Sequence, residues 1–393
     1  MNRYQITLEE MATHQNFYDA LKKCNDDVSY KYSVQEYDVN CPTYIQNTID
    51  LILDDGIPYI QKALHIIIKE RGKARIITPI YIGDRVIQKV ICDNVLIPSI
   101  MPHLIYDNGA SIKGKGVDFA RKRVDKFIEE AKRYYGAENI YILSFDVKSY
   151  FDSIPHILCK QVLDKYVYDS RISNLVLGII ESYHLAEINA LDIDENERQR
   201  MIDDLFTHKC RGICLGSQIS QIMAGAVLND FDHYIKDVLR VKYYERYMDD
   251  GLIICRNKEE AKKLLSKLQD YIEKLGLEFN KKKTHIIKAS KGFKFLKVKY
   301  TIKENGKVVK RLDHRGITTQ KRKLRSFKKK VDNGKMTLDD VYNSLQSWLA
   351  HSKVAKDHHK SVKSVLDLYD KLFGGYKITK KYFKEHPEEQ KKK

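Results

Sequence analysis

Apolar side chains recur along this chain with two different periods. Over residues 1–70 they recur every three or four positions, most regularly in Ile45–Ile68, which predicts helices. A glycine then introduces the β-branched stretch 71–80, which predicts a strand. Because residues two apart share one face of a strand, Lys73 and Arg75 should project from the same side.

Two further apolar stretches lead to carboxylates. Tyr141–Val147 is mostly apolar but contains Asp146, so we expect a buried strand that ends in one costly carboxylate. Asp249 and Asp250 stand between two strand-like runs, which predicts a hairpin with adjacent carboxylates at its tip. Like charges so close repel each other, and a bound divalent cation would relieve that repulsion.

The rest of the pattern is helical up to about residue 207 and mixed after the hairpin. Val117–Tyr135 reads as a basic amphipathic helix, and Asn257–Leu275 as a charged helix that the following glycine ends. Phe293–Ile302 alternates as one strand, and the Asn-Gly pair at 305–306 predicts the hairpin that follows it. From His314 onward the chain is basic and helical.

Composition narrows the class of partner. The formal charge is +17, from 70 Lys and Arg against 53 Asp and Glu, which favours a nucleic acid. No apolar run is long enough to span a bilayer, and the first residues lack the apolar core of a signal peptide. The 7 cysteines include no C-x-x-C pair, which indicates reduced thiols. We therefore expect a cytoplasmic protein that does not contact membranes.

A glycine-rich loop at 108–116 carries Lys113 and Lys115. Glycines allow close approach of the backbone to a phosphate, and the lysines add positive charge. The loop is not a Walker motif, because no G-K-[ST] sequence closes it. Taken alone, it is a weak indication of phosphate or nucleic-acid binding.

Asp146, Asp249 and Asp250 together suit a more specific chemistry. Phosphoryl transfer with two metal ions requires two or three carboxylates from neighbouring strands. At this point the sequence resembles a family: residues 145–152, 212–221 and Tyr247-Met248-Asp249-Asp250 resemble motifs A, B and C of reverse transcriptases, in the same order. Other segments resemble further parts of these enzymes. The fingers are matched by Lys73–Arg75 with Pro79 and by Arg85 with Gln88, and motif D by 277–280 with Lys283-Thr284. Phe295-Leu296 resembles the primer grip, and the helices from Thr318 resemble the thumb.

The resemblance implies an α+β right-hand polymerase fold with helical fingers, an antiparallel-sheet palm and a helical thumb. The implied domains are residues 1–140 for the N-terminal helices and fingers, 141–312 for the palm with a fingers-side insertion near 156–211, and 313–393 for the basic thumb and tail. The implied activity is RNA-directed DNA synthesis. The resemblance implies three partners: an RNA template, expected to be a cognate non-coding RNA, the DNA product and dNTPs. A homo-oligomer is compatible with the sequence.

Roles for individual residues follow from the same resemblance. Asp146, Asp249 and Asp250, with the Val147 carbonyl, would hold two Mg²⁺ ions, which Mn²⁺ could replace. Phe151 would lie under the sugar and exclude a 2′-hydroxyl, where RNA-dependent RNA polymerases commonly carry Asp. The implied nucleotide-binding residues are Lys73, Arg75, Phe151, Gly216 and Lys283, the last either a general acid or a solvated charge. The implied template and primer contacts are Arg85, Lys113, Lys115, Lys297, Lys321, Arg322 and Arg325.

Two departures from the family pattern leave the biological role open. Cys214-Leu215 replaces the usual Pro-Gln before the motif B glycine, as in mutagenic diversity-generating enzymes, and Lys297 replaces a common glycine. The forms of motif B and of the strand from Phe295 favour bacterial or phage defence-associated enzymes. The alternatives are a retron or diversity-generating enzyme, template-independent DNA synthesis, an inactive nucleic-acid-binding relative, and an unrelated two-metal nuclease or scaffold.

Overall fold

The computed structural model describes residues 3–56, 66–70, 73–77, 79–189, 191–353 and 359–377. The chain forms two compact units that interleave in sequence. Unit 1 comprises 1–123, 144–253 and 263–285, and unit 2 comprises 124–143, 254–262 and 286–393. No helix among the described residues is both long and apolar enough to cross a membrane. All seven cysteines are free thiols, as the sequence predicts.

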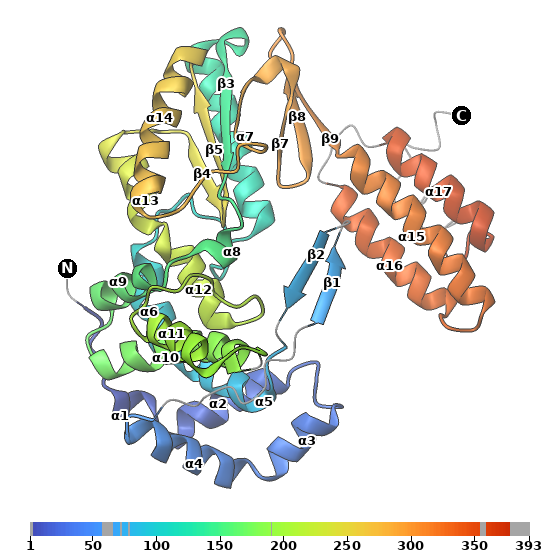
Figure 1. Cartoon of the computed structure of the whole chain (residues 1–393). Coiled ribbons are helices and arrows are strands. Elements are labelled where there is room, and N and C mark those ends of the chain that lie inside the picture. Colours follow the sequence, from blue (N-terminus) through green and yellow to red (C-terminus); the bar gives the residue numbers. More distant parts are fainter. Residues whose placement is uncertain are drawn as a thin grey trace. The chain divides into compact units, whose positions relative to one another are not determined.

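Short helices begin unit 1 (Figure 1). They are α1 Leu8–Met11, α2 His14–Asn25, α3 Tyr32–Val39 and α4 Cys41–Leu53. Thr7 and Thr13 cap the first two, each accepting a backbone N–H bond of the following turn. The helical prediction is confirmed for these ranges. The helix expected over Ile45–Ile68 ends at Leu53, residues 57–65 lie outside the described part of the structure, and the prediction is wrong at Ile66–Ile68. Residues 66–70 form strand β1 instead.

Strand β1, Ile66–Glu70, pairs antiparallel with β2, Lys73–Ile77, from Ile66 opposite Ile77 to Glu70 opposite Lys73. Three consecutive isoleucines explain the strand, because β-branched side chains lose rotamer freedom in a helix. The strand predicted around Lys73 and Arg75 is confirmed. The side chains of these two residues lie outside the described part of the structure.

Helices supply most of the remaining framework of unit 1. Helix α5, Ile82–Ile91, buries Val86, Ile87 and Val90 and packs against α2. It continues through a π-helical turn, Cys92–Leu96, into α6, Ile97–Ile100. Further helices are α8 Tyr150–Ser153, α9 His156–Tyr166, α10 Ser170–Asn189, α11 Glu195–Phe206, α12 Gln218–Val227 and α13 Asn229–His233, with a second π-helical turn at Tyr234–Val238.

A four-stranded sheet has the order β4-β5-β3-β6. Its strands are β3 Tyr141–Asp146, β4 Tyr244–Tyr247, β5 Asp250–Cys255 and β6 His285–Lys288. β4 and β5 form the predicted hairpin, with Tyr247 opposite Asp250. The two-residue turn is therefore Met248-Asp249, and Asp250 is already the first residue of its strand.

The predicted helices on either side of this sheet in the sequence are confirmed. Helix α7 spans Val117–Tyr135, as predicted, and buries Val124, Ile128 and Ala131. Helix α14 spans Lys258–Lys274. The Asn257 side chain caps α14 by accepting the Glu260 N–H bond at 2.8 Å.

In unit 2, the single strand expected over Phe293–Ile302 is wrong. It is two strands, β7 Phe293–Phe295 and β8 Val298–Ile302, folded back on each other. The turn between them is Leu296-Lys297, and both residues have positive φ, at 44° and 71°. A primed two-residue turn matches strand twist but normally takes Asn or Gly, so alternation alone conceals it. The predicted Asn-Gly hairpin is confirmed, joining β8 to β9, Val308–Leu312.

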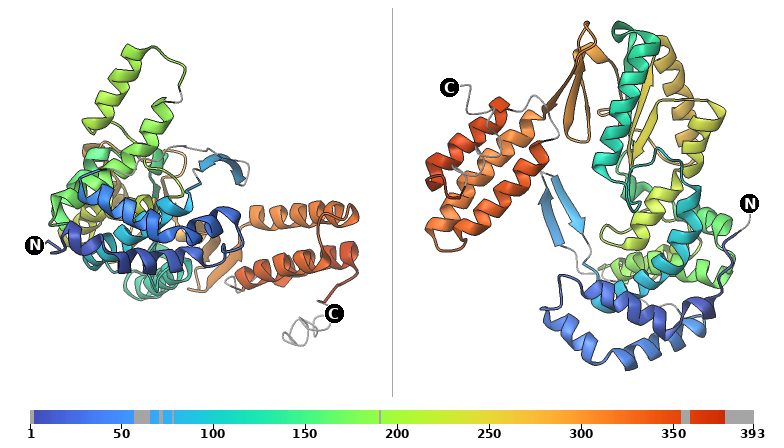
Figure 2. Two further views of the ribbon diagram at one scale, coloured as in Figure 1. Left: turned by 90° about the horizontal axis from the view of Figure 1, so that it is seen from below. Right: turned by 180° about the vertical axis from the view of Figure 1, so that it is seen from behind.

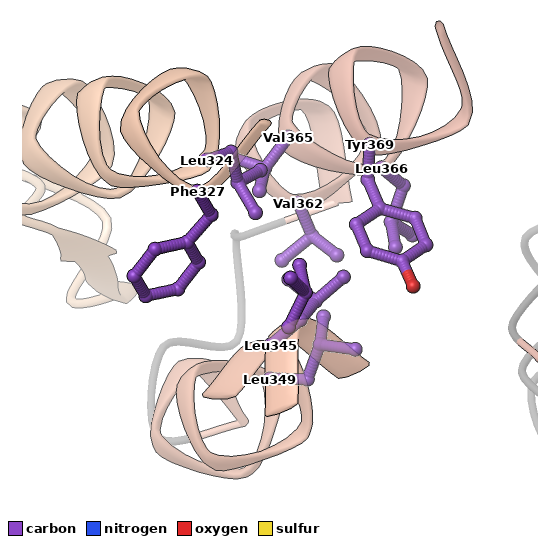
Figure 3. Close-up of a cluster of buried hydrophobic side chains, with 9 residues drawn as sticks. Leu324, Phe327, Leu345, Leu349, Val362, Val365, Leu366 and Tyr369 are labelled. Atoms are coloured by element: carbon purple, nitrogen blue, oxygen red, sulfur yellow. The ribbon is translucent and has the colours of Figure 1, made fainter. Parts of the chain in front are cut away.

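Three helices end unit 2: α15 His314–Asp332, α16 Leu338–Ser352 and α17 His359–Phe373. The three helices contact one another, and the right view of Figure 2 shows them side by side. Their shared core includes Leu324, Leu345 and Val365 (Figure 3). Thr337 and Asp340 form the predicted capping box at α16. Trp348 packs partly buried against this core, as predicted.

Gly251 is required by its packing, which gives a prediction for stability. A Cβ atom at this position would overlap the Phe145 ring, which itself packs against Phe279 with centroids 4.9 Å apart. We expect Gly251→Ala to lower the free energy of unfolding by about 1–3 kcal/mol, because the buried ring must shift. The matched control is Gly225→Ala, where a Cβ would meet nothing within 4 Å.

That control should be neutral or stabilising by about 0.5–1 kcal/mol, since alanine favours a helix over glycine. Urea unfolding of both variants measures the difference. Equal effects of the two substitutions would contradict the packing explanation.

Candidate active site

Backbone hydrogen bonds bring the predicted carboxylates together. The Val147 N–H, just after β3, donates to the Asp249 carbonyl at 3.2 Å. On the other side, the Asn280 N–H donates to the Asp146 carbonyl at 2.7 Å. Segments that carry Asp146, Asp249 and Lys283 are therefore joined through their main chains, all within unit 1.

The electrostatics of the site follow from crowding of like charges. Asp146 is 3% exposed, while Asp249 and Asp250 are half-buried. Burial, then the neighbouring Asp249 and Asp146, raises the pKa of Asp250 to about 7. Burial and Asp146 likewise raise the pKa of Asp249. Asp146 thus makes ionisation of both Asp249 and Asp250 less favourable.

Lys283 supplies a positive charge to this group. Its Nζ forms a short ion pair with Asp146 Oδ2, and the lysine side chain stays 48% exposed. Partial burial lowers the pKa of Lys283, but the contact with Asp146 outweighs it, and the net pKa is raised. The structure therefore brings together four predicted site residues: Asp146, Asp249, Asp250 and Lys283.

The donor set suits a divalent cation. Carboxylate oxygens are the ligands that Mg²⁺ prefers, and their raised pKa values show an excess of negative charge that a cation would offset. Val147 lies opposite Phe279 in a β-bridge whose hydrogen bonds are made by the residues on either side of each. The bridge therefore does not use the Val147 carbonyl, which the sequence predicts as a metal ligand. Among the described residues, no group of three or more His, Cys, Asp or Glu side chains has a geometry that could hold a metal ion.

A buried ion pair that sequence reasoning missed supports the hairpin. Arg246 and Asp232 are both 0% exposed, and Arg246 Nη2 donates to Asp232 Oδ2 at 2.6 Å. Arg246 Nη1 also donates to the Met248 carbonyl in the turn, at 2.9 Å. Arg246 thereby fixes the turn that carries Asp249. The signal in the sequence is weak: one Arg between the tyrosines of β4, two residues before Met248.

The opposite side of β4 carries a second buried acid, Glu245. Its carboxylate oxygens have no hydrogen-bond partner among the described residues. Burial and then Asp107 raise its pKa to about 9, so this side chain is neutral at pH 7. Nearby, Lys115 donates to the Tyr106 and Asn108 carbonyls at 2.6 and 3.2 Å. Lys115 is thus bound within its own loop in this structure.

The segment 212–221 packs against helix α5 through Gln88. Gln88, 2% exposed, accepts bonds through Oε1 from the Ser217 hydroxyl at 2.9 Å and the Gln218 N–H at 3.2 Å. Ser217 in turn caps α12. Gly216, exposed, has a φ of 119° that favours glycine. Phe151 is half-buried in α8, next to fully packed Tyr150.

The other predicted contact residues lie apart from the carboxylates in sequence and are positioned as follows. Arg85 is half-buried in α5, and Lys113 is exposed in its loop. Lys297 is exposed in the β7–β8 turn. On α15, Arg322 and Arg325 are exposed and Lys321 is half-buried. Their contacts with template or primer stay predictions.

Comparison with known families places the chain. A family model described as reverse transcriptase (RNA-dependent DNA polymerase) matches residues 67–300. This match covers more than half of the chain and includes Asp146, Asp249, Asp250 and Lys283. The chain therefore belongs to the reverse transcriptase family, and its mixed helices and antiparallel sheets are those of the polymerase fold.

Solved structures of telomerase are similar to this chain. Apo telomerase from Candida tropicalis, truncated from its C-terminal domain, is 14% identical, with TM-score 0.39 over 63% of this chain and 54% of that one. Telomerase from Candida albicans, in complex with a TWJ fragment of telomeric RNA, is 12% identical, with TM-score 0.43 over 80% and 56%. The chain thus spans little more than half of these proteins. No curated protein matches it.

The Arg246–Asp232 pair gives a second prediction. We expect Arg246→Met to lower the free energy of unfolding by about 3–5 kcal/mol, because it leaves Asp232 buried without a counter-charge. Arg256→Met is the matched control, since Arg256 is 68% exposed and 4.0 Å from Glu260. It should cost less than about 1 kcal/mol. Chemical unfolding measures the free energy of unfolding of both variants. Equal decreases in the two variants would contradict this ranking.

Proposed function

We propose that this protein is an RNA-directed DNA polymerase that adds dNTPs by phosphoryl transfer with two metal ions. The observation that carries the proposal is the joining of Asp146, Asp249 and Asp250 through the Val147–Asp249 backbone bond. Membership of the reverse transcriptase family over residues 67–300 supports it.

Asp146, Asp249 and Asp250 would hold Mg²⁺, with Mn²⁺ as a substitute and the Val147 carbonyl as a further ligand. When bound, such ions lower the pKa of an attacking hydroxyl and stabilise the leaving oxygens. The Arg246–Asp232 pair keeps the turn in place while the carboxylates repel one another. Lys283 neutralises part of the charge on Asp146 and, with its raised pKa, retains a proton that it can donate to a leaving pyrophosphate.

Phe151 and β2 would shape the nucleotide site. The Phe151 ring would lie under the sugar and leave no space for a 2′-hydroxyl, so that DNA is the product. Arg75 and Lys73 on β2 would bind the triphosphate, for which a guanidinium is a suitable planar donor. Gly216 would allow the motif B loop to approach the nucleotide and the template.

Basic residues outside this site would hold the RNA template and the growing DNA. Residues 315–330 contain many Lys and Arg and no acidic residue, which favours binding to the phosphates of a duplex. An RNA–DNA hybrid is close to A-form and is recognised through its shape and backbone. We assign this role to Lys321, Arg322 and Arg325, with Arg85, Lys113, Lys115 and Lys297 as further contacts.

For the biological role, we propose bacterial anti-phage defence or a related retroelement. The form of motif B, Gly216-Ser217-Gln218-Ile219-Ser220-Gln221, supports this assignment, together with the strand from Phe295. Leu215 favours the alternative of a diversity-generating enzyme, because those enzymes also carry an aliphatic residue there. Sequencing the nucleic acid that co-purifies with the protein distinguishes these roles from a retron.

The catalytic proposal predicts the effect of removing one carboxylate. We expect Asp249→Asn to lower primer extension with Mg²⁺ and dNTPs by at least about 10³-fold, since a lost metal ligand costs several kcal/mol at the transition state. Asp270→Asn, at an exposed acid on α14, is the control and should keep its activity. Incorporation of labelled dNTPs on an RNA template measures both.

Three results would contradict the proposal in different ways. Unchanged activity of Asp249→Asn would exclude the carboxylates from catalysis. Shortening of the RNA without DNA synthesis would indicate a nuclease. Labelled product from NTPs but not from dNTPs would exclude the role given to Phe151.

The raised pKa values predict that cation binding displaces protons. Because Asp250 has a pKa of about 7, it is protonated in the metal-free protein below that pH and must lose its proton to bind Mg²⁺. The apparent Mg²⁺ affinity should therefore rise about tenfold per pH unit for each displaced proton, and level off above pH ~7. Calorimetric titrations from pH ~5.5 to ~8.5 measure this slope.

The variant Asp250→Asn should remove about one proton from the slope, whereas Asp270→Asn should leave it unchanged. An affinity that does not depend on pH below about 7 would show that Asp250 binds no cation.

A further inference from the structure

A cluster of titratable side chains lies at the start of the motif B loop, and the proposed chemistry does not use it. Its members are His156 on α9, Glu181 and His184 on α10, and His208 after α11. His156 is 0% exposed and Glu181 is 5% exposed. All four belong to unit 1.

Two of these imidazoles bind one backbone carbonyl. His156 Nε2 lies 2.7 Å from the Gly212 oxygen, and His184 Nε2 lies 2.9 Å from the same oxygen. A carbonyl oxygen only accepts hydrogen bonds, so each ring must carry a proton on Nε2. Both lone pairs of this oxygen are then occupied. One donor would be enough to satisfy a buried carbonyl, and here two helices each supply one.

Gly212 also connects to the segment that carries Phe151. The Gly212 N–H donates to the Ile154 carbonyl, and the Ile213 N–H donates to the Phe151 carbonyl, both at 2.8 Å. Gly212 has a φ of 102°, which other residues rarely adopt. The two histidines therefore hold a residue whose own bonds fix the main chain of Phe151.

The rest of the cluster lies beside the His156 ring without a hydrogen bond to its Nδ1. Burial lowers the pKa of His156 to about 4, so the ring is neutral at pH 7 and keeps one proton, which the Gly212 carbonyl places on Nε2. His156 Nδ1 lies 3.9 Å from Glu181 Oε1, and Glu181 in turn forms a short contact with His208 Nδ1. Burial raises the pKa of Glu181 and of the facing thiols Cys159 and Cys210.

We propose that His156 and His184 are positioning residues for sugar selection: by clamping the Gly212 carbonyl, they hold Phe151 where it excludes a 2′-hydroxyl. This inference rests on the proposed function. Neither histidine need touch the nucleotide, because the effect passes through the main chain of Gly212 and Ile213. Loss of the clamp lets the Phe151 segment move, and a displacement of about 1 Å is enough to change discrimination.

The experiment compares a dNTP with the matching rNTP. The values of kcat/KM for dATP and ATP are measured on one primer–template, in the wild type and in His156→Leu/His184→Leu. We expect the ratio of the two values to fall about tenfold or more, with the KM for dATP rising more than its kcat falls. The ratio does not depend on the folded fraction of the enzyme, so lower stability alone leaves it unchanged. If the double variant does not fold, the single variant His184→Leu, at a half-buried position, gives the same readout.

Two matched variants separate positioning from general effects. In His156→Gln/His184→Gln the amide nitrogens can still donate to the Gly212 carbonyl, so the ratio should be largely restored. His233→Leu removes another imidazole that bonds a backbone carbonyl, that of His103 at 3.1 Å, and should leave the ratio unchanged.

An unchanged ratio in the leucine variants would overturn the clamp, as would an equal loss in the glutamine and leucine variants. In both cases the wild type still makes DNA and loses that activity in Asp249→Asn, so the proposed function stands. A wild type that makes no DNA would overturn the proposed function and the clamp together.

Discussion

The buried pair of Arg246 and Asp232 is the interaction on which the site depends. Both charges are withdrawn from water, which costs several kcal/mol for each ion and is offset only by good geometry. The arginine meets this condition with bonds to Asp232, the Gly225 carbonyl and the Met248 carbonyl. The hairpin turn, helix α12 and the segment carrying Asp232 therefore keep one arrangement, since any displacement would leave a charge buried without its partner.

This constraint explains how the protein tolerates three crowded carboxylates. Their mutual repulsion, visible in the raised pKa of Asp249 and Asp250, favours separation of the strand ends. The Val147–Asp249 backbone bond and the arginine below the turn oppose that separation. Lys283 offsets part of the negative charge through its ion pair with Asp146. The site thus keeps an excess of negative charge, which suits it to bind cations.

Sequence reasoning predicted what local patterns encode and missed what distant contacts determine. Asp146 stands out because a carboxylate is costly in an apolar strand, and Asp249 because it adjoins Asp250 at a hairpin tip. Helix α7 and the Asn-Gly hairpin follow from periodicity and turn chemistry. The Leu296-Lys297 turn was missed because neither residue normally favours positive φ. Arg246 was missed because its partner Asp232 lies fourteen residues earlier, on another element. Only the fold shows that the two side chains meet.

The Arg246–Asp232 pair and the histidines that bind the Gly212 carbonyl act by the same physical principle. Arg246 and the histidines at Gly212 each place N–H donors on a backbone carbonyl that is linked through the main chain to a residue with a proposed chemical role. A backbone carbonyl has a fixed position relative to its own chain, whereas a side chain can change rotamer. A hydrogen bond to the carbonyl therefore fixes the position of the main chain. Asp249 and Phe151 are thereby set by buried polar residues that need not touch the nucleotide. Under the proposed function, substitutions at these residues would alter accuracy and cation binding as well as stability.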